Sequence, residues 1–450
     1  MRLVDVSSSD FGGLLRELRR RLSPEGEVVS PASRQRTIAV FGVPLSPQEV
    51  VARICKDVAE RGVDALLYYI EKLDGKSLSR SGVFVPEEDL KAAHQSVGRE
   101  FLEVVRRVWA RIERFQSAIR HRDVRITIPG GYLEERYRPI SRVGVCVPGG
   151  AAAYPSTVLM TVVPARVAGV EEIVVATPPT AFGAENPYVL ATCWELGVRF
   201  VFRAGGAHGV AAMAYGVEGL EPVDKIVGPG NLFVALAKKF VFGRVGIDSV
   251  AGPSEVVVIA DSSAEPRYLA YDLIAQAEHA PGTSILLAWE RTILERTISA
   301  VEEALHRVDR AEEARQCLEE FGLAVLTDGP EQACRIAAEI APEHLHIIAE
   351  DAGSLADKIP TAGAVFLGNY SPVACGDYAA GPSHVLPTSG TARFASGLSV
   401  NDFLRSHSVI CLEREGLEEM APDIQVLAEC EGLTAHRESV LCRLQSRGVS

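Results

Sequence analysis

Two polar side chains near the end of a predicted helix could bind a metal. Residues 272–282, DLIAQAEHAPG, have an apolar stripe at helical spacing and finish with Pro-Gly, which is typical of a helix stop. Gln276 and His279 are three residues apart, so a helix would present them on one face. A carboxamide oxygen and an imidazole nitrogen side by side form half of a metal site. The alternative is a helix end with one polar face.

Other stretches carry acid–base groups. In Ala-Pro-Glu343-His344 a carboxyl adjoins an imidazole between a predicted helix and a predicted strand, and such a pair suits proton transfer. A solvated turn is the alternative. The glycine- and proline-rich stretch 375–388 holds Asp377 and His384, and long loops of this kind are uncommon unless they are functional.

Two more candidate regions are less specific alone. Ser254 precedes a predicted strand at its entrance, in the run Ala-Gly-Pro-Ser-Glu. Glu431 and His436 lie where a C-terminal helical pattern breaks and restarts. Cysteine pairs at zinc-binding spacing are absent from the sequence, so any metal ligands must be nitrogen and oxygen atoms.

Glycine-rich turns follow three predicted strands and could approach a phosphate. They are Val-Pro-Gly-Gly-Ala at 147–151, Ala-Gly-Gly-Ala-His at 204–208, and Gly-Pro-Gly-Asn at 228–231, which opens a helix. A helix N-terminus offers free N–H groups to an anion. None of the three is a G-x-G-x-x-G dinucleotide fingerprint, so tight turns remain the alternative.

The elements that would position these groups alternate between strand and helix. Such alternation predicts parallel, helix-covered sheets, with ligands bound beyond the strand ends. We expect two sets of strands, which are 143–147, 173–177, 198–202 and 225–227, then 256–260, 284–288, 324–327, 346–348 and 364–367. Helical spacing also runs from 47 to about 120, and the chain after 386 reads as loop and then helix.

Composition limits the class of protein. A chain of 450 residues exceeds one simple core and predicts two or three domains. A net charge of −13 without a basic stripe argues against a nucleic-acid partner. The sequence has no long apolar segment for a signal peptide or a membrane span, and its nine scattered cysteines favour a reducing compartment, so we expect a cytoplasmic enzyme of small molecules.

Together these stretches resemble the histidinol dehydrogenase family over roughly residues 30–442. The matching segments appear in the family's order, as VPGG…YPSTVLM, GPGN, AGPSEVVVIAD, DLIAQAEH, APEHL, GAVFLG, GDYAAGPSHVLPT and EGLTAH. Eight ordered matches are far more specific than any one motif.

The resemblance implies a zinc-dependent, NAD-linked homodimer that oxidises L-histidinol to L-histidine through a bound aldehyde, the last steps of histidine biosynthesis. It implies two incomplete Rossmann-like domains with small helical end segments, intertwined between the subunits. The implied divisions are an arm (1–40), a discontinuous catalytic domain (41–140 and 255–390), an NAD-binding domain (141–254) and a tail that reaches the partner's site (391–450).

The family's residue roles transfer by position. The implied zinc ligands are Gln276, His279, Asp377 and His436, and the implied catalytic pair is Glu343 and His344. Ser254, His384 and Glu431 match positions that bind the substrate. The implied zinc ligands and the implied catalytic pair also contact the substrate in this family. Asn231, Cys146 and His208 match cofactor-binding positions.

This sequence departs from the family pattern at three of these places. Cys146 replaces a usual Tyr and His208 a usual Gln, both in cofactor loops, while Ser383 replaces a usual Asn beside His384. A related enzyme acting on another primary alcohol, such as a sulfonated diol, is the main alternative. The retained His384, Glu431 and Ser254 favour histidinol. A non-catalytic, zinc-stabilised dimer is a third possibility, against which the intact Glu343–His344 pair argues.

Overall fold

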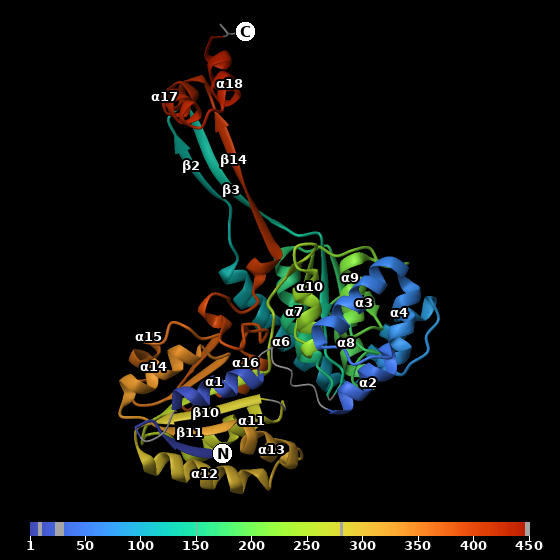
Figure 1. The fold of residues 1–450 in the computed structure, drawn as a ribbon, viewed down its shortest axis with the longest axis vertical. Helices are drawn as coiled ribbons and strands as arrows, with labels where there is room; N and C mark the ends of the chain where they lie inside the picture. The colour runs from blue at the N-terminus through green and yellow to red at the C-terminus, as the bar shows by residue number, and fades with distance from the viewer. Residues whose placement is uncertain (8–10, 23–30, 151, 280–281, 446–450) are drawn as a thin grey trace.

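Two helix-covered parallel sheets form the body of the molecule, and a long antiparallel ribbon projects from it (Figure 1). The computed structural model describes residues 1–7, 11–22, 31–150, 152–279 and 282–445. Within these ranges no helix combines the length and the apolar character needed to cross a bilayer. The predicted α/β class with parallel sheets is confirmed.

The first sheet has the strand order β6-β5-β4-β7-β8, all parallel. Its strands are β4 (Arg142–Cys146), β5 (Glu172–Ala176), β6 (Phe200–Phe202), β7 (Lys225–Val227) and β8 (Gly246–Ile247). The connecting helices are α7 (Pro155–Ala168), α8 (Pro187–Glu195), α9 (Gly206–Tyr215) and α10 (Leu232–Val241). The bounds of four of these strands were predicted to within two residues, because a short β-branched run between two helices leaves little choice of where the strand begins and ends.

Helices from before the first sheet cover both of its faces. On one face α3 (Pro47–Arg61) and α4 (Val63–Tyr69) pack with α9 and α10. On the other face α5 (Glu87–Ser96) and α6 (Arg99–Ile119) pack with α7 and α8.

The placement of these four helices differs from our expectation for 41–140, which assigned that segment to the unit of 255–390. Helical periodicity shows that a face is apolar, but it does not show which sheet covers that face.

The second sheet has the order β1-β11-β10-β9-β12-β13, also parallel. Its strands are β1 (Arg2–Asp5), β9 (Ser254–Ala260), β10 (Gly282–Ala288), β11 (Gly322–Leu326), β12 (His344–Ile348) and β13 (Ala364–Leu367). Its helices include α11 (Pro266–Ala277), α12 (Arg291–Leu305), α13 (Ala311–Phe321), α14 (Pro330–Ile340), α15 (Ala352–Asp357) and α16 (Val373–Tyr378).

The N-terminal segment 1–40, which was predicted as an arm, contributes to the second unit. Its first strand, β1, pairs with β11 along the edge of the second sheet, and Val4 and Phe11 join the core of that unit. The helices α1 (Phe11–Leu22) and α2 (Pro31–Phe41) follow. This strand lies outside the strand–helix alternation that identified the other strands of the sheet, so the sequence analysis did not recognise it.

The ribbon consists of β2 (Val124–Ile128), β3 (Gly131–Pro139) and β14 (Leu404–Leu412), which we call the stalk. It carries two helices at its far end, α17 (Arg414–Cys430) and α18 (Thr434–Gln445), which we call the tip (Figure 1). The sequence analysis expected loop and then helix for the chain after 386, and it expected no strand at 124–139. These strands expose apolar residues on a ribbon, so the usual alternation of buried and exposed positions is missing.

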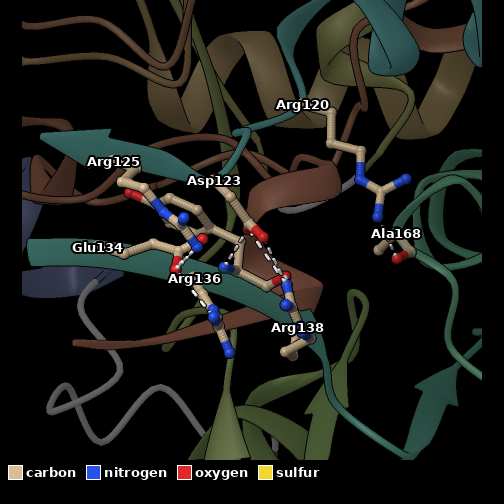
Figure 2. Close-up of polar contacts among 8 residues, drawn as sticks. Arg120, Asp123, Arg125, Glu134, Arg136, Arg138 and Ala168 are labelled. Carbon is tan, nitrogen blue, oxygen red and sulfur yellow. Dashed lines mark hydrogen bonds and ion pairs between the residues drawn. The ribbon is translucent and has the colours of Figure 1, made fainter. Parts of the chain in front are cut away.

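Ion pairs between charged side chains stabilise the stalk, both along β3 and between neighbouring strands (Figure 2). Glu134 pairs with Arg125 and Arg136, each at 2.9 Å, and Asp123 pairs with Arg138 at 3.0 Å. At the base, the Arg120 guanidinium donates to the carbonyl of Ala168, the last residue of α7, at 3.2 Å. The stalk is therefore anchored to the first unit while the tip stands clear of both units.

Candidate active site

A cavity of about 1100 Å³ lies where the two units meet, beyond the carboxyl ends of the first sheet's strands. This is where open parallel sheets bind ligands. The first unit contributes 146–150, Pro178, Thr180, 204–210 and 228–234, and the second contributes Ser254, His279, Glu343, His344, Asp377 and His384.

The α11 helix brings Gln276 to this region and then ends. Pro266 occupies its first turn, and the Glu265 side chain accepts from the N–H of Arg267 at the N-cap. Gln276 is buried behind the cavity wall, and its Oε1 lies 3.2 Å from His344 Nδ1. His279 lies just past the helix end and lines the cavity, with its N–H donating to the Gln276 carbonyl at 3.3 Å. The predicted stop at 281–282 lies partly outside the described residues.

Glu343 and His344 enter the site together at the start of β12. Ala341, which caps α14 with a φ of 50°, turns the chain toward them. Both side chains are buried, and His344 Nδ1 lies 3.8 Å from Glu343 Oε2. Burial raises the pKa of Glu343 well above its usual value and lowers the pKa of His344 to about 3. Both groups are therefore held neutral when no charge is nearby.

Ser254 and Glu255 hold the Glu343 carboxyl from the neighbouring strand β9. The Glu255 N–H donates to Glu343 Oε2 at 2.9 Å, and the Ser254 side chain also forms a hydrogen bond to this carboxyl. The register of β9 and β12, which pairs Val256 with His344, makes this contact possible. The structure thus places Ser254 beside the acid–base pair.

Asp377 and His384 reach the site from the stretch 375–388. Asp377 lies in α16, and its Oδ1 is 3.7 Å from His344 Nε2. Burial raises the pKa of Asp377 to about 6 and lowers the pKa of His384 to about 4. His384 Nδ1 donates to the Asp377 carbonyl at 2.9 Å, and Nε2 lies 3.2 Å from Thr157 Oγ1 in α7. The Ser383 hydroxyl donates to the Met160 carbonyl of the same helix at 2.8 Å.

Three predicted metal ligands, Gln276, His279 and Asp377, therefore lie around His344. Their donors are a carboxamide oxygen, an imidazole nitrogen and a carboxylate oxygen, which suit zinc. Within the described residues the Gln276 Nε2 donor is buried without a hydrogen-bond partner, so the chain alone does not satisfy this amide. Among those residues no cluster of three or more His, Cys, Asp and Glu side chains forms a metal site. Gln276, His279 and Asp377 are thus the predicted ligands that a single chain brings to this region.

Glu431 and His436 do not join this group. Both are exposed on the tip, at the opposite end of the molecule from α11 and α16 (Figure 1). Within a single chain the structure therefore separates the tail residues from the other predicted ligands.

The predicted cofactor residues Cys146, His208 and Asn231 all line the cavity. Asn231 caps α10, accepting from the N–H groups of Phe233 and Val234 at 3.0 and 3.2 Å. His208 is buried, and its Nε2 lies 3.0 Å from Asp74 Oδ2. Burial raises the pKa of the Cys146 thiol to about 12, so this residue packs as a neutral apolar group.

Sequence reasoning missed a buried pair behind the ligands. His346 Nδ1 lies 2.8 Å from Asp272 Oδ2, and its Nε2 donates to the Gly368 carbonyl at 3.0 Å. This contact ties α11, which carries Gln276, to β12, which carries His344. The signal was available, because His344 and His346 are two residues apart on one strand and so share a face.

Comparisons with known proteins agree in one family. The histidinol dehydrogenase family model matches residues 45–444. A histidinol dehydrogenase of Rhodopirellula baltica is 55% identical over 442 residues, covering 98% of this chain and 96% of that protein. One from a Synechococcus strain is 45% identical over 398 residues, covering 88% and 92%. The crystal structure of histidinol dehydrogenase from Elizabethkingia anophelis superposes with a TM-score of 0.85 at 36% identity, covering 89% of this chain and 93% of that one.

Replacing His346 should loosen the helix that carries Gln276. His346→Leu would leave Asp272 as a buried, uncompensated carboxylate, which typically costs about 3–5 kcal/mol. We expect amide hydrogen exchange to show a local unfolding free energy for α11 lower by that amount. In His346→Leu/Asp272→Leu most of the loss should be recovered. Unchanged exchange in the single variant would contradict a bracing role for this pair.

Proposed function

The chain belongs to the histidinol dehydrogenase family, and we propose that it oxidises L-histidinol to L-histidine in two NAD-dependent steps at a zinc site shared between two copies. As a member of this family it is an oxidoreductase that oxidises histidinol in histidine biosynthesis. The observation that carries the finer proposal is the buried Glu343–His344 pair, flanked by Gln276 and Asp377 in a cavity between two sheets.

The glycine loops of the first unit support NAD binding. The segments 147–150, 204–208 and 228–231 all line the same cavity at the strand ends. Glycine backbone without side chains can approach a pyrophosphate closely, and residues 231–234 at the start of α10 line the cavity. The bound nicotinamide would accept one hydride in each oxidation.

The nitrogen and oxygen donors support zinc. Gln276, His279 and Asp377 would hold the metal, with His436 supplied by a second copy. Bound zinc would act as a Lewis acid and as an anchor for nitrogen donors of the substrate. A nearby cation would also favour the carboxylate forms of Asp377 and Glu343, reversing the effect of burial on their pKa values.

In the first oxidation His344 takes the proton of the alcohol hydroxyl while the carbinol carbon loses a hydride. The neutral imidazole has a free lone pair for this purpose. Burial makes it a weak base, but an ionised Glu343 at 3.8 Å would stabilise the imidazolium and so raise the pKa of His344. The product is the aldehyde, which stays bound in the cavity and is so kept from side reactions.

In the second oxidation Glu343 takes a proton from water, which attacks the aldehyde carbon to give a hydrate. The hydrate then loses a second hydride and, with the help of His344, a proton. The balance is one alcohol, one water and two NAD⁺ giving one carboxylate, two NADH and three protons. Ser254 and the Glu255 N–H hold the Glu343 carboxyl in place for the water step.

The exposed apolar side chains support a dimer in which the tip covers a second copy's site. Tyr378, which lines the cavity, is 62% exposed, and Phe394 is 84% exposed. On the tip and stalk Leu427 is 64% and Ile410 70% exposed. Apolar surface of this kind marks an interface. Since His436 and Glu431 lie on the same tip, pairing would bring both to the site that lacks a fourth ligand.

A sulfonated diol is the second candidate substrate. Such an anion needs cationic donors, whereas His384 is held neutral by burial and the cavity's other polar groups include two carboxyls, Glu343 and Asp377. The buried Glu343–His344 pair argues against a non-catalytic, zinc-stabilised dimer, because a structural metal site needs no acid–base pair.

The proposed substrate can be tested with the zinc-loaded protein. We expect NAD reduction with L-histidinol and with the corresponding amino aldehyde, and at least about a hundredfold lower kcat/KM with a sulfonated diol, which corresponds to about 2.7 kcal/mol. Dialysis against a chelator should abolish the reaction, and added zinc should restore it. Equal or better use of the sulfonated diol would reject histidinol as the substrate.

Glu343→Gln should separate the two oxidations. The amide oxygen can still accept from the Glu255 N–H, so the fold is retained, but an amide cannot take a proton from water. We expect histidinol still to be oxidised to the aldehyde level, but more slowly, because the His344 imidazolium loses the Glu343 charge beside it. Aldehyde oxidation should fall further, by about a hundredfold or more, in line with the loss of a general base. Glu350→Gln, at an exposed position beyond β12, is the matched control. Unimpaired aldehyde oxidation by Glu343→Gln would remove Glu343 from this role.

Shared sites can be tested by complementation between two inactive variants. His436→Ala lacks the tip ligand, and Gln276→Ala/His279→Ala lacks the helix ligands, so each homodimer should be inactive. In a heterodimer one site combines the intact helix of the first chain with the intact tip of the second. By the symmetry of a two-fold dimer, half of the sites should be active.

The control for this experiment is a heterodimer of His436→Ala with wild type, isolated through two different affinity tags. It should also keep half of its sites. If purified heterodimers of the two inactive variants show no activity, His436 does not act across the interface.

A further inference from the structure

A buried lysine lies beneath the third glycine loop and plays no part in the chemistry described above. Lys238 in α10 is 1% exposed. Its ammonium group pairs with the Asp248 carboxylate and donates to the Gly228 carbonyl at 3.0 Å. A lysine this deeply buried is rare in proteins unless it is paired. Its partners therefore show what it holds in place.

Asp248 completes a clamp on the same glycine. Its Oδ2 accepts from the Gly228 N–H at 2.7 Å, and its Oδ1 accepts from the Ser249 N–H at 2.6 Å. Both backbone polar groups of Gly228 are thus fixed by one ion pair. A Cβ on Gly228, whose φ is +104°, would lie 2.3 Å from the Cys146 carbonyl oxygen, so the loop already sits tightly on the end of β4.

The clamp also starts the linker between the two units. From Asp248 the chain runs along the cavity to Ser254, where β9 of the second sheet begins. On the way the Gly252 N–H donates to Thr388 Oγ1 at 2.5 Å, and the linker ends at the contacts with Glu343. A shift at Asp248 would therefore displace both the glycine loop and the strand that holds the catalytic carboxyl.

Stability alone does not account for such a pair. A buried ion pair is often no more stabilising than apolar residues of the same size, because both charges lose their hydration. Here Lys238 and Asp248 form their other hydrogen bonds with backbone groups of the glycine loop and the linker, which line the cavity. A positioning role explains this arrangement.

We propose that Lys238 and Asp248 are positioning residues that hold the Gly228–Asn231 loop in its cofactor-binding conformation and fix the start of the linker to the second unit. This inference rests on the proposed binding of NAD in the cavity. It assigns no proton transfer to either residue, because neither touches the reacting atoms.

The test separates positioning from folding by measuring the dissociation constant for NAD by titration calorimetry and the Tm of the same samples. Lys238→Met and Asp248→Asn should each weaken NAD binding by about tenfold, or about 1.4 kcal/mol, and lower the Tm, because each leaves one buried partner uncompensated. Lys238→Met/Asp248→Asn should recover most of the Tm but not the affinity. Lys239→Met, at the neighbouring exposed lysine, should change neither.

Each outcome decides between the explanations. Recovery of both Tm and affinity in the double variant, or unchanged affinity in both single variants, overturns the positioning role. If wild type itself fails to bind NAD, the proposed function fails first. Should the variants not fold, hydrogen exchange of wild type decides, since NAD is expected to protect 227–234 and 246–252 together. Protection of 147–150 and 204–208 without those two segments would overturn the proposal.

Discussion

The burial of a carboxyl and an imidazole side by side is the constraint on which the rest of the site depends. Glu343 and His344 lie at the junction of two sheets, where water cannot stabilise their charged forms. The neighbouring groups partly replace the hydrogen bonds that water would otherwise form with these two side chains. Backbone N–H and hydroxyl groups hold Glu343, while Gln276 and Asp377 flank the two nitrogens of His344. A metal cation and a cationic or neutral substrate would supply the remaining charge balance.

The two-unit architecture allows this burial without closing the site. Each sheet is a complete core on its own, so the cavity between them need not contribute to folding. The stalk then carries the tip away from the body (Figure 1). In the proposed dimer, a tip with few buried residues and exposed apolar side chains would gain stability by covering another copy. Placing a ligand on it would couple assembly to catalysis.

Local patterns in the sequence predicted much of this structure. Short β-branched runs between helices located most strands of both sheets, and Gln276, His279, Glu343, His344, Asp377 and His384 were all identified before they were seen together. Further features besides the N-terminal strand escaped prediction for physical reasons. The stalk strands lack a buried face, the helices of 47–119 carry no mark of which sheet they cover, and the pairs His346–Asp272 and Lys238–Asp248 join residues far apart or on different elements.

The central claim is a nitrogen–oxygen metal site that one chain cannot complete. X-ray absorption at the zinc edge, on zinc-loaded wild type and His436→Ala, tests it most directly. We expect only nitrogen and oxygen neighbours at about 2.0–2.2 Å in wild type, and one imidazole fewer in the variant. Because the exposed Cys375 lies two residues from Asp377, thiolate ligation is a real alternative. A sulfur neighbour at about 2.3 Å, or an identical metal shell in the two proteins, would contradict the account.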